Sequence, residues 1–262
     1  MKQIKIFIII SLLGLYFSQN PVFAKVQEQA ELNQSFYLAN LLYKENKYTQ
    51  AIEEYNKIIT KGFENGYLYY NLANSYFKNG QLNYAILNYE RARFFIPNDS
   101  DLKSNYEYTR SLLNLNQQEA SSNLFLKWID KLSEGFSIGA LTLVLSLLYT
   151  VFFAILTLRI FIRRIKRIDG ILLTVVIALF TLSAIIFNRK ISYLNHGAIV
   201  TSNNLGAKFE PFDSATTYFT LSEGAKIKIV DATNNWYKIK RGDDKIGWVK
   251  KSEVEMISPP KP

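Results

Sequence analysis

The chain has 262 residues and a formal net charge of +9, and it contains one His and no Cys. The absence of Cys excludes disulfide frameworks, cysteine zinc sites and thiol catalysis. A single His excludes a multi-histidine metal site and disfavours a Ser-His-Asp triad. A basic balance indicates a nucleic-acid partner only where the charge gathers on one surface.

Residues 1–24 have the pattern of a secretory signal peptide. Lys2 and Lys5 precede a mostly apolar run of twelve residues at 6–17. That run is too short to cross a bilayer comfortably, and the tripeptide ending at Ala24 resembles a signal-peptidase site. We therefore expect cleavage after Ala24. The alternative is that the segment is retained as an N-terminal anchor.

Residues 25–131 are charge-balanced, with twelve basic and twelve acidic residues, and they contain an internal repeat. Residues 35–63 align with residues 69–97 at an offset of 34. Leu, Ala and Tyr recur at helical spacing: Leu38, Ala39, Ala51 and Tyr55 in the first copy, Leu72, Ala73, Ala85 and Tyr89 in the second. Because Ala lets two helices approach closely, the pattern predicts packed helix pairs.

This pattern resembles the tetratricopeptide repeat, whose period is 34 residues. The second copy is the closer match because it keeps the final Pro97, where the first copy has Phe63. The resemblance implies an all-α repeat domain over residues 25–131, with residues 101–115 as a capping helix that covers the apolar end of the stack. A degenerate extra repeat in residues 101–130 is the alternative.

Stacked repeats of this family form a concave groove, and the resemblance implies which side chains face it. Carried over by offset, the groove candidates are Asn40, Tyr43, Asn71, Asn74, Phe77 and Asn105. Asn amides hydrogen-bond well to an extended peptide backbone, so a protein segment is the expected ligand. The alternative is that these residues are ordinary polar surface. Some family members clamp a peptide carboxylate with basic residues, but those places hold Phe36, Asp101 and Asn105 here.

Two uncharged runs predict membrane-spanning helices. Residues 137–158 give 22 residues without charge. As a helix they extend about 33 Å, which is enough for a hydrocarbon core of roughly 30 Å. Residues 171–187 form a shorter run of 17, and the flanking Arg189 and Lys190 are expected to reach the interface. A buried hairpin in a soluble domain is the alternative.

The segment between the two runs, residues 159–169, carries five basic residues against one acid: Arg159, Arg163, Arg164, Lys166 and Arg167. Short basic loops stay in the cytoplasm, so both flanking domains are expected on the extracytoplasmic side. The predicted signal peptide exports the N-terminal domain to that same side. Much of the positive charge is therefore a topology signal, and nucleic-acid binding is not expected.

After residue 190 the sequence changes to short alternating segments separated by turn residues, as in β-strands. These segments are residues 198–200, 226–229, 236–240 and 246–249. With Glu223-Gly224 before a strand and Gly247-Trp248-Val249 near the end, the pattern resembles bacterial SH3 domains over residues 196–257. The resemblance implies a small all-β barrel, and residues 205–212 depart from the family pattern.

Three aromatic residues of this region, Trp236, Tyr237 and Trp248, are candidates for a recognition surface. The alternative is that the two Trp side chains seal a barrel with little core. His196 lies just outside the second span and is expected in a linker. No phosphate loop, metal-ligand spacing or nucleophile with a base is found, so no catalytic residue, metal or cofactor is predicted.

The order of these parts resembles the BatE family of bacterial aerotolerance operons. The expected fold class is a multidomain membrane protein with tetratricopeptide-like helical repeats, a transmembrane hairpin and an SH3-like barrel. The resemblance implies a non-enzymatic scaffold in the inner membrane. Its implied partners are Bat proteins with von Willebrand factor A domains and a MoxR-type ATPase, with membrane lipid around the spans. A module that binds peptidoglycan through the barrel is the alternative.

Overall fold

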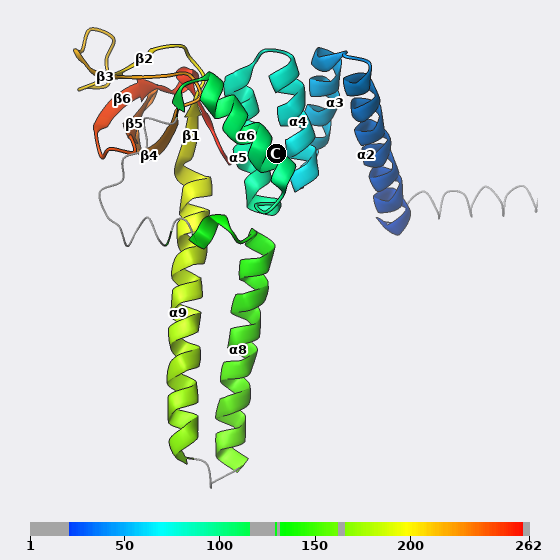
Figure 1. Ribbon diagram of the computed structural model, residues 1–262, viewed down its shortest axis with the longest axis vertical. Helices are drawn as coiled ribbons and strands as arrows, with labels where there is room; N and C mark the ends of the chain where they lie inside the picture. The colour runs from blue at the N-terminus through cyan, green and yellow to red at the C-terminus, as the bar shows by residue number, and fades with distance from the viewer. Residues whose placement is uncertain (1–20, 116–128, 130–131, 162–165, 259–262) are drawn as a thin grey trace, which may run out of the picture. The chain divides into compact units, whose positions relative to one another are not determined.

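The computed structural model describes residues 21–115, 129, 132–161 and 166–258, which form helices followed by an antiparallel sheet (Figure 1). The predicted signal segment up to residue 20 and the basic loop residues 162–165 lie outside the described residues. The chain divides into two compact units, residues 1–63 and residues 64–261.

The first unit contains the helix pair α2 (Pro21–Lys44) and α3 (Tyr48–Thr60). Buried side chains recur every three or four residues along α3: Ala51, Ile52, Tyr55, Ile58 and Ile59. Asn46 turns the chain between the helices with a φ of 61°, which Asn tolerates better than most residues. Tyr55 Oη donates to Asn40 Oδ1 at 2.7 Å, so a polar contact also joins the two helices.

The second unit begins with α4 (Gly66–Lys78), α5 (Leu82–Phe95) and α6 (Ser100–Leu112). Asn65 and Asp99 cap α4 and α6, because their side chains accept main-chain N–H hydrogen bonds at 2.8 and 2.9 Å. The predicted helical N-terminal region is confirmed, and a helix is found where residues 101–115 predict one. Most of residues 116–130, the remainder of the alternative extra repeat, lie outside the described residues.

One polar contact recurs at the offset of the sequence repeat. In the second unit Tyr89 Oη donates to Asn74 Oδ1 at 2.6 Å, as Tyr55 does to Asn40 in the first unit. The two tyrosines are 34 residues apart, and so are the two asparagines. The sequence repeat therefore corresponds to a repeated pair of helices.

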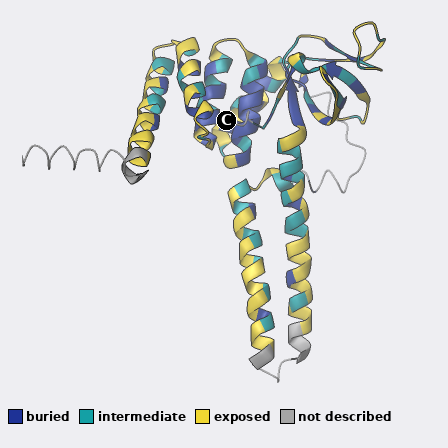
Figure 2. Cartoon of the chain, turned by 180° about the vertical axis from the view of Figure 1, so that it is seen from behind, coloured by how far each residue is buried: buried dark blue, intermediate teal, exposed yellow. Residues whose placement is uncertain are grey.

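Helix α5 is buried around its whole circumference, unlike α3 (Figure 2). Its buried residues include the polar and charged Asn83, Asn88, Glu90 and Arg91. Arg91 donates from Nε to Ile257 O and from Nη2 to Met256 O, both at 2.9 Å. Asn83 Nδ2 donates to Thr201 O at 2.8 Å. The helical layer therefore packs directly on the C-terminal sheet within one compact unit.

Helices α8 (Ile138–Phe161) and α9 (Lys166–His196) are each long and apolar enough to cross a membrane. They pack side by side, and most of their side chains are exposed (Figure 2). Exposed apolar surface of this length indicates membrane association. The predicted spans correspond to these helices: residues 138–158 of the first run lie in α8, and residues 171–187 lie in α9.

The basic segment predicted as a loop at residues 159–169 is helical at both ends. Arg159 lies in α8, and Lys166 and Arg167 lie in α9. Arg and Lys are good helix formers, so a run of positive charge does not end a helix. Arg163 and Arg164 lie outside the described residues.

The sheet has seven antiparallel strands in the order β3-β2-β6-β5-β4-β1-β7. They are β1 (Gly197–Val200), β2 (Leu205–Lys208), β3 (Thr217–Leu221), β4 (Lys226–Ala232), β5 (Trp236–Lys240), β6 (Ile246–Lys250) and β7 (Val254–Met256). A short 3₁₀ turn, η2 (Lys251–Glu253), precedes β7. Alternate residues such as Ile227, Ile239 and Val249 are buried, as the alternating pattern predicts.

Within the described residues, α9 passes into the sheet without a linker. The helix ends at His196 and β1 begins at Gly197, so the expectation that His196 lies in a linker is wrong. Beyond its apolar run the helix packs against α5, where the ring of Tyr193 stacks on that of Phe94 with centroids 6.0 Å apart. A Cβ at residue 197 would lie 2.5 Å from Tyr193 O, so only glycine fits this junction without displacement.

Candidate functional site

The structure gathers two of the predicted groove residues into an amide cluster between α4 and α6. Asn105 Nδ2 donates to Asn74 Oδ1 at 3.1 Å and to Tyr70 Oη at 3.0 Å. Phe77, one turn along α4 from Asn74, packs against Tyr108 with ring centroids 5.9 Å apart. The Tyr108 ring is 58% exposed. This face therefore offers amides and an accessible aromatic ring together.

The remaining groove candidates are also half-buried. Asn40 and Tyr43 belong to the first unit, where Tyr43 packs edge-on against Tyr48 at 5.5 Å. Asn71 lies on α4, and its main-chain carbonyl accepts from Ser75 Oγ at 2.9 Å. Because Tyr55 and Tyr89 occupy the side-chain oxygens of Asn40 and Asn74, part of the Asn hydrogen-bonding capacity holds helix pairs together. The recurrence of Tyr at the same offset was the sequence signal for this role.

The aromatic candidates of the sheet differ in exposure. Trp236 is only 9% exposed, with Lys250 Nζ 5.8 Å from its ring centroid, so it seals the sheet as the alternative predicts. Trp248 is half-buried beneath Lys238, whose Nζ lies 5.7 Å from its ring. Tyr237 is half-buried beside Lys251 at 5.1 Å. Each ring thus has a lysine at cation–π distance.

Sequence reasoning missed a second aromatic group, in the β2–β3 hairpin. Phe209, Phe212 and Tyr218 are 56%, 46% and 44% exposed. The rings of Phe209 and Tyr218 are in contact, with centroids 4.4 Å apart and planes tilted by 30°. The two Phe residues fall in the segment that departs from the family pattern, and their spacing was the available signal. We call these three residues the hairpin aromatics.

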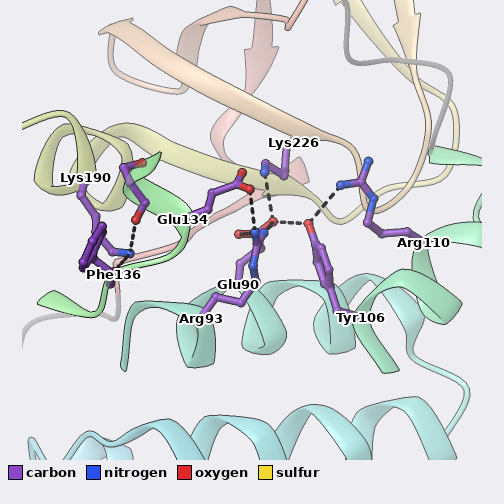
Figure 3. A network of polar contacts seen from close by, with 9 residues as sticks. Glu90, Arg93, Tyr106, Arg110, Glu134, Phe136, Lys190 and Lys226 are labelled. Carbon is purple, nitrogen blue, oxygen red and sulfur yellow. Dashed lines mark hydrogen bonds and ion pairs between the residues drawn. The ribbon is translucent and has the colours of Figure 1, made fainter. Parts of the chain in front are cut away.

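A buried charged junction joins α5 to the sheet (Figure 3). Glu90, which is 2% exposed, accepts from Lys226 Nζ at 3.1 Å and from Arg93 Nη1 at 3.4 Å, and Tyr106 Oη also donates to it. Burial by itself raises the pKa of the Glu90 carboxyl. The positive charges of Lys226 and Arg93 and the Tyr106 hydrogen bond outweigh that effect, and the pKa falls to about 2. Glu90 is therefore an ionised, fully engaged carboxylate.

The junction extends from Glu90 to α6 and to the segment before α8 (Figure 3). Arg93 Nη2 lies 3.5 Å from Glu134 Oε2, and its guanidinium lies 4.9 Å from the ring centroid of Tyr106. Burial by itself lowers the pKa of Arg93, but the charges of Glu90 and Glu134 together with Tyr106 outweigh burial and raise it. Arg110 Nη1 donates to Tyr106 Oη at 3.4 Å. Buried networks of hydrogen bonds and ion pairs of this kind fix the packing of the elements that they join.

Lys190 on α9 completes the junction (Figure 3). It donates to Ser133 O at 3.0 Å and to Phe136 O at 2.6 Å, and it is 8% exposed. The ammonium of Lys190 is held by two main-chain carbonyls just before α8 and lies 5.5 Å from the ring centroid of Phe94. The expectation that Arg189 and Lys190 extend to the membrane interface stays a prediction.

Both carboxylates of the junction are paired with basic side chains. Among the residues that the structure describes, no group of three or more His, Asp or Glu side chains is arranged to hold a metal ion. The acidic members Glu90 and Glu134 are paired with two cations, Arg93 of α5 and Lys226 of β4. The arrangement therefore fixes the positions of α5, α6, α9 and β4 relative to one another.

Residues 210–255 match the family of bacterial SH3 domains. The match begins after β2 and covers β3 to β6 and the start of β7, so the SH3-like character predicted for the C-terminal region is confirmed there. No curated protein matches the chain. A bacterial SH3 domain beside two apolar helices supports a membrane-associated module that binds protein or peptidoglycan.

Proposed function

We propose that this protein is a membrane-anchored, non-enzymatic scaffold that binds protein segments outside the cytoplasm. The observation that carries the proposal is the buried junction centred on Glu90, which joins the helical layer, the sheet and α9. A ligand held by the helical layer or the sheet is thereby fixed at a set distance from the membrane helices. Such an arrangement suits a protein that positions a partner beside a membrane complex.

The face between α4 and α6 is the proposed protein-binding surface. Asn74 and Asn105 supply amides, and Tyr108 supplies an exposed ring that can cover an extended peptide. The resemblance to the BatE family supplies the partners, which are Bat proteins with von Willebrand factor A domains acting with a MoxR-type ATPase in aerotolerance or envelope stress. The tetratricopeptide-like pattern and the repeated Tyr–Asn bond support this use of the helices.

The test is affinity purification of the tagged full-length protein from detergent, with Tyr108→Ser compared with Tyr67→Ser. Both tyrosines are 58% exposed, but Tyr67 lies apart from the amide cluster in the contacts that the structure gives. We expect the wild type and Tyr67→Ser to recover a von Willebrand domain protein and Tyr108→Ser to lose most of it. Equal recovery with both variants would remove this face from the proposal.

A second candidate function is binding of peptidoglycan by the SH3-like sheet. The family match and the hairpin aromatics favour it, because closely spaced exposed rings suit sugar and peptide faces alike. Because residues 64–261 form one compact unit, the full-length protein is the appropriate material. It should pellet with insoluble cell wall, and Tyr218→Ser should weaken pelleting more than Ile246→Ser. Those two side chains are 44% and 45% exposed. Protein that stays in the supernatant would end this candidate.

The proposed topology places residues 159–169 in the cytoplasm and both soluble parts outside it. The Lys190–Phe136 hydrogen bond supports the placement of both soluble parts on one side of the membrane. It brings the residues before α8 and those at the end of α9 to the same end of the hairpin. A reporter inserted within residues 163–167 should report cytoplasm, and one after residue 257 should report the outside. The reverse pattern would contradict the proposed orientation.

A further inference from the structure

The outer face of the sheet carries lysines on β2, β4 and β5, with Trp248 of β6 between them. Lys228 of β4 lies opposite Lys240 of β5, and Lys238 of β5 lies opposite Trp248 of β6. Lys208 of β2 lies opposite the same Trp248. The intervening residues, such as Ile239 and Val249, are fully buried in the core, so alternation places these lysines on the opposite side. We call Lys208, Lys228, Lys238, Lys240 and Trp248 the basic face.

This face is electrostatically unfavourable in isolation. Like charges directly opposite each other in a sheet destabilise it, and Lys228 and Lys240 occupy such a pair. The charge of Lys240 is balanced by Asp244, whose Oδ1 lies 2.8 Å from Lys240 Nζ, whereas Lys228 is exposed. Lys238 lies over Trp248 and opposite Asp231 in the register. An anionic partner would relieve the remaining repulsion, so charge complementarity favours an acidic surface.

The basic face is held close to the membrane by the fold itself. The Lys190–Phe136 bond lies at one edge of the two apolar segments, because α8 begins at Ile138 and the uncharged run of α9 ends at residue 187. From Lys190 to Gly197 is seven residues of helix, or about 10 Å. Lys228 pairs with Gly197, so it lies at the first level of the sheet above α9.

The β4–β5 hairpin returns toward the membrane end of the sheet. Since β1 continues away from α9 and β4 is antiparallel to β1, β4 runs back past Gly197 from Lys228 to Ala232 (Figure 1). Val230, at a bulge in this returning segment, is 45% exposed. Lysines beside an exposed apolar side chain and a Trp ring are the combination that a lipid headgroup layer attracts.

We propose that the basic face binds the anionic headgroups of the bilayer that α8 and α9 cross. The inference rests on membrane anchoring by these helices and not on their orientation or on any protein ligand. Lipid is favoured over a free acidic polymer because the α9–β1 junction has no linker and holds the face within reach of the headgroups. The contact fixes the sheet on the membrane and leaves the hairpin aromatics available for another ligand.

The test uses the full-length protein in nanodiscs of phosphatidylcholine and phosphatidylglycerol, with bromine on only one of the two lipids. The quenching of Trp248 is obtained by subtracting the signal of Trp248→Phe from that of the wild type. We expect brominated phosphatidylglycerol to quench Trp248 at least about twofold more than brominated phosphatidylcholine. High salt should reduce that preference.

The double variant Lys228→Gln/Lys238→Gln should abolish the preference, and the matched double variant Lys78→Gln/Lys103→Gln, on exposed positions of α4 and α6, should keep it. Equal quenching by both lipids, or a preference that survives loss of Lys228 and Lys238, would overturn the proposal. So would lysine-dependent pelleting with insoluble cell wall in the absence of lipid-selective quenching. Failure of the chain to co-elute with nanodiscs would overturn membrane anchoring as well.

Discussion

Helices α3 and α5 occupy equivalent places in the sequence repeat, yet they differ in what they bury. Both bury an Ala and a Tyr at matching positions: Ala51 and Tyr55 in α3, Ala85 and Tyr89 in α5. The charges of α3 remain on its surface, where Lys57 pairs with Glu54 at 2.6 Å. The charges of α5 are buried against the sheet and the segment before α8. The repeat thus determines one face of each helix, and the neighbouring elements determine the other.

The largest expected effect comes from neutralising the centre of the α5 junction. Glu90→Gln leaves Arg93 and Lys226 facing each other without their carboxylate, which should cost on the order of 3 kcal/mol of unfolding free energy. The measurement is thermal unfolding of the full-length protein in detergent at neutral pH. Glu54→Gln on α3 is the control, because it disrupts a pair whose Lys is mostly exposed. A loss as large in the control would contradict the contrast between the two helices.

The same variant should change the pH dependence of stability. The pKa of Glu90 is about 2 in the folded protein, below its ordinary value of 4.5. A lowered native pKa gives stability that is present above pH 4.5 and is lost as the pH falls toward 2. Glu90→Gln should remove that acid-dependent step. An unchanged acid limb of the stability curve in the variant would show that Glu90 is not held as an ionised group.

The next largest effect is expected at Arg91, whose counterpart in α3 is Lys57. Arg91→Ala removes the donors to Ile257 O and Met256 O and leaves those carbonyls buried, which should cost about 2 kcal/mol. Lys57→Ala should leave the melting temperature nearly unchanged because Lys57 is exposed. Hydrogen exchange should show faster exchange in β7 for Arg91→Ala. Protection of β7 equal to wild type would argue against docking of α5 on this edge.

Much of the fold could be predicted because the relevant patterns are local. The stripe of Ala and Tyr predicts the helix pairs, the uncharged runs predict α8 and α9, and alternation predicts β4, β5 and β6. The burial of Glu90 and Arg91 could not be predicted in this way. In sequence they look like the exposed charges of a surface helix, and their partners Lys226 and Ile257 lie more than a hundred residues away.

The candidate site shows the same difference between local patterns and contacts that are distant in sequence. Asn74, Phe77 and Asn105 follow from the repeat offset, whereas the hairpin aromatics depend on a loop whose pairing only the folded sheet reveals. Trp236 was a candidate ligand contact, and its burial beneath Lys250 makes it a packing residue instead. A residue type alone does not distinguish these outcomes, because an aromatic ring serves equally well in a core and on a surface.

A smaller effect is expected at the junction of α9 and β1, which also depends on contacts distant in sequence. Gly197→Ala would place a Cβ 2.5 Å from Tyr193 O and 2.8 Å from Ile257 Cδ1, which should cost about 1–2 kcal/mol. Gly170→Ala within α9 is the control, because its Cβ meets nothing within 4 Å and should not destabilise the protein. Thermal unfolding of both variants in detergent gives the comparison. Equal stability would mean that the junction yields easily and does not fix the sheet above α9.

The smallest effects test the face that α3 and α5 share. Tyr55→Phe and Tyr89→Phe each remove one hydroxyl that donates to an Asn, at 2.7 and 2.6 Å, and each should cost about 1 kcal/mol. Because the two bonds lie in separate compact units, hydrogen exchange should report the two losses in different parts of the chain. Tyr55→Phe should speed exchange in α2 and α3, and Tyr89→Phe in α4 and α5. If both variants instead loosened only the second unit, the repeated bond would not have the same role in the two helix pairs.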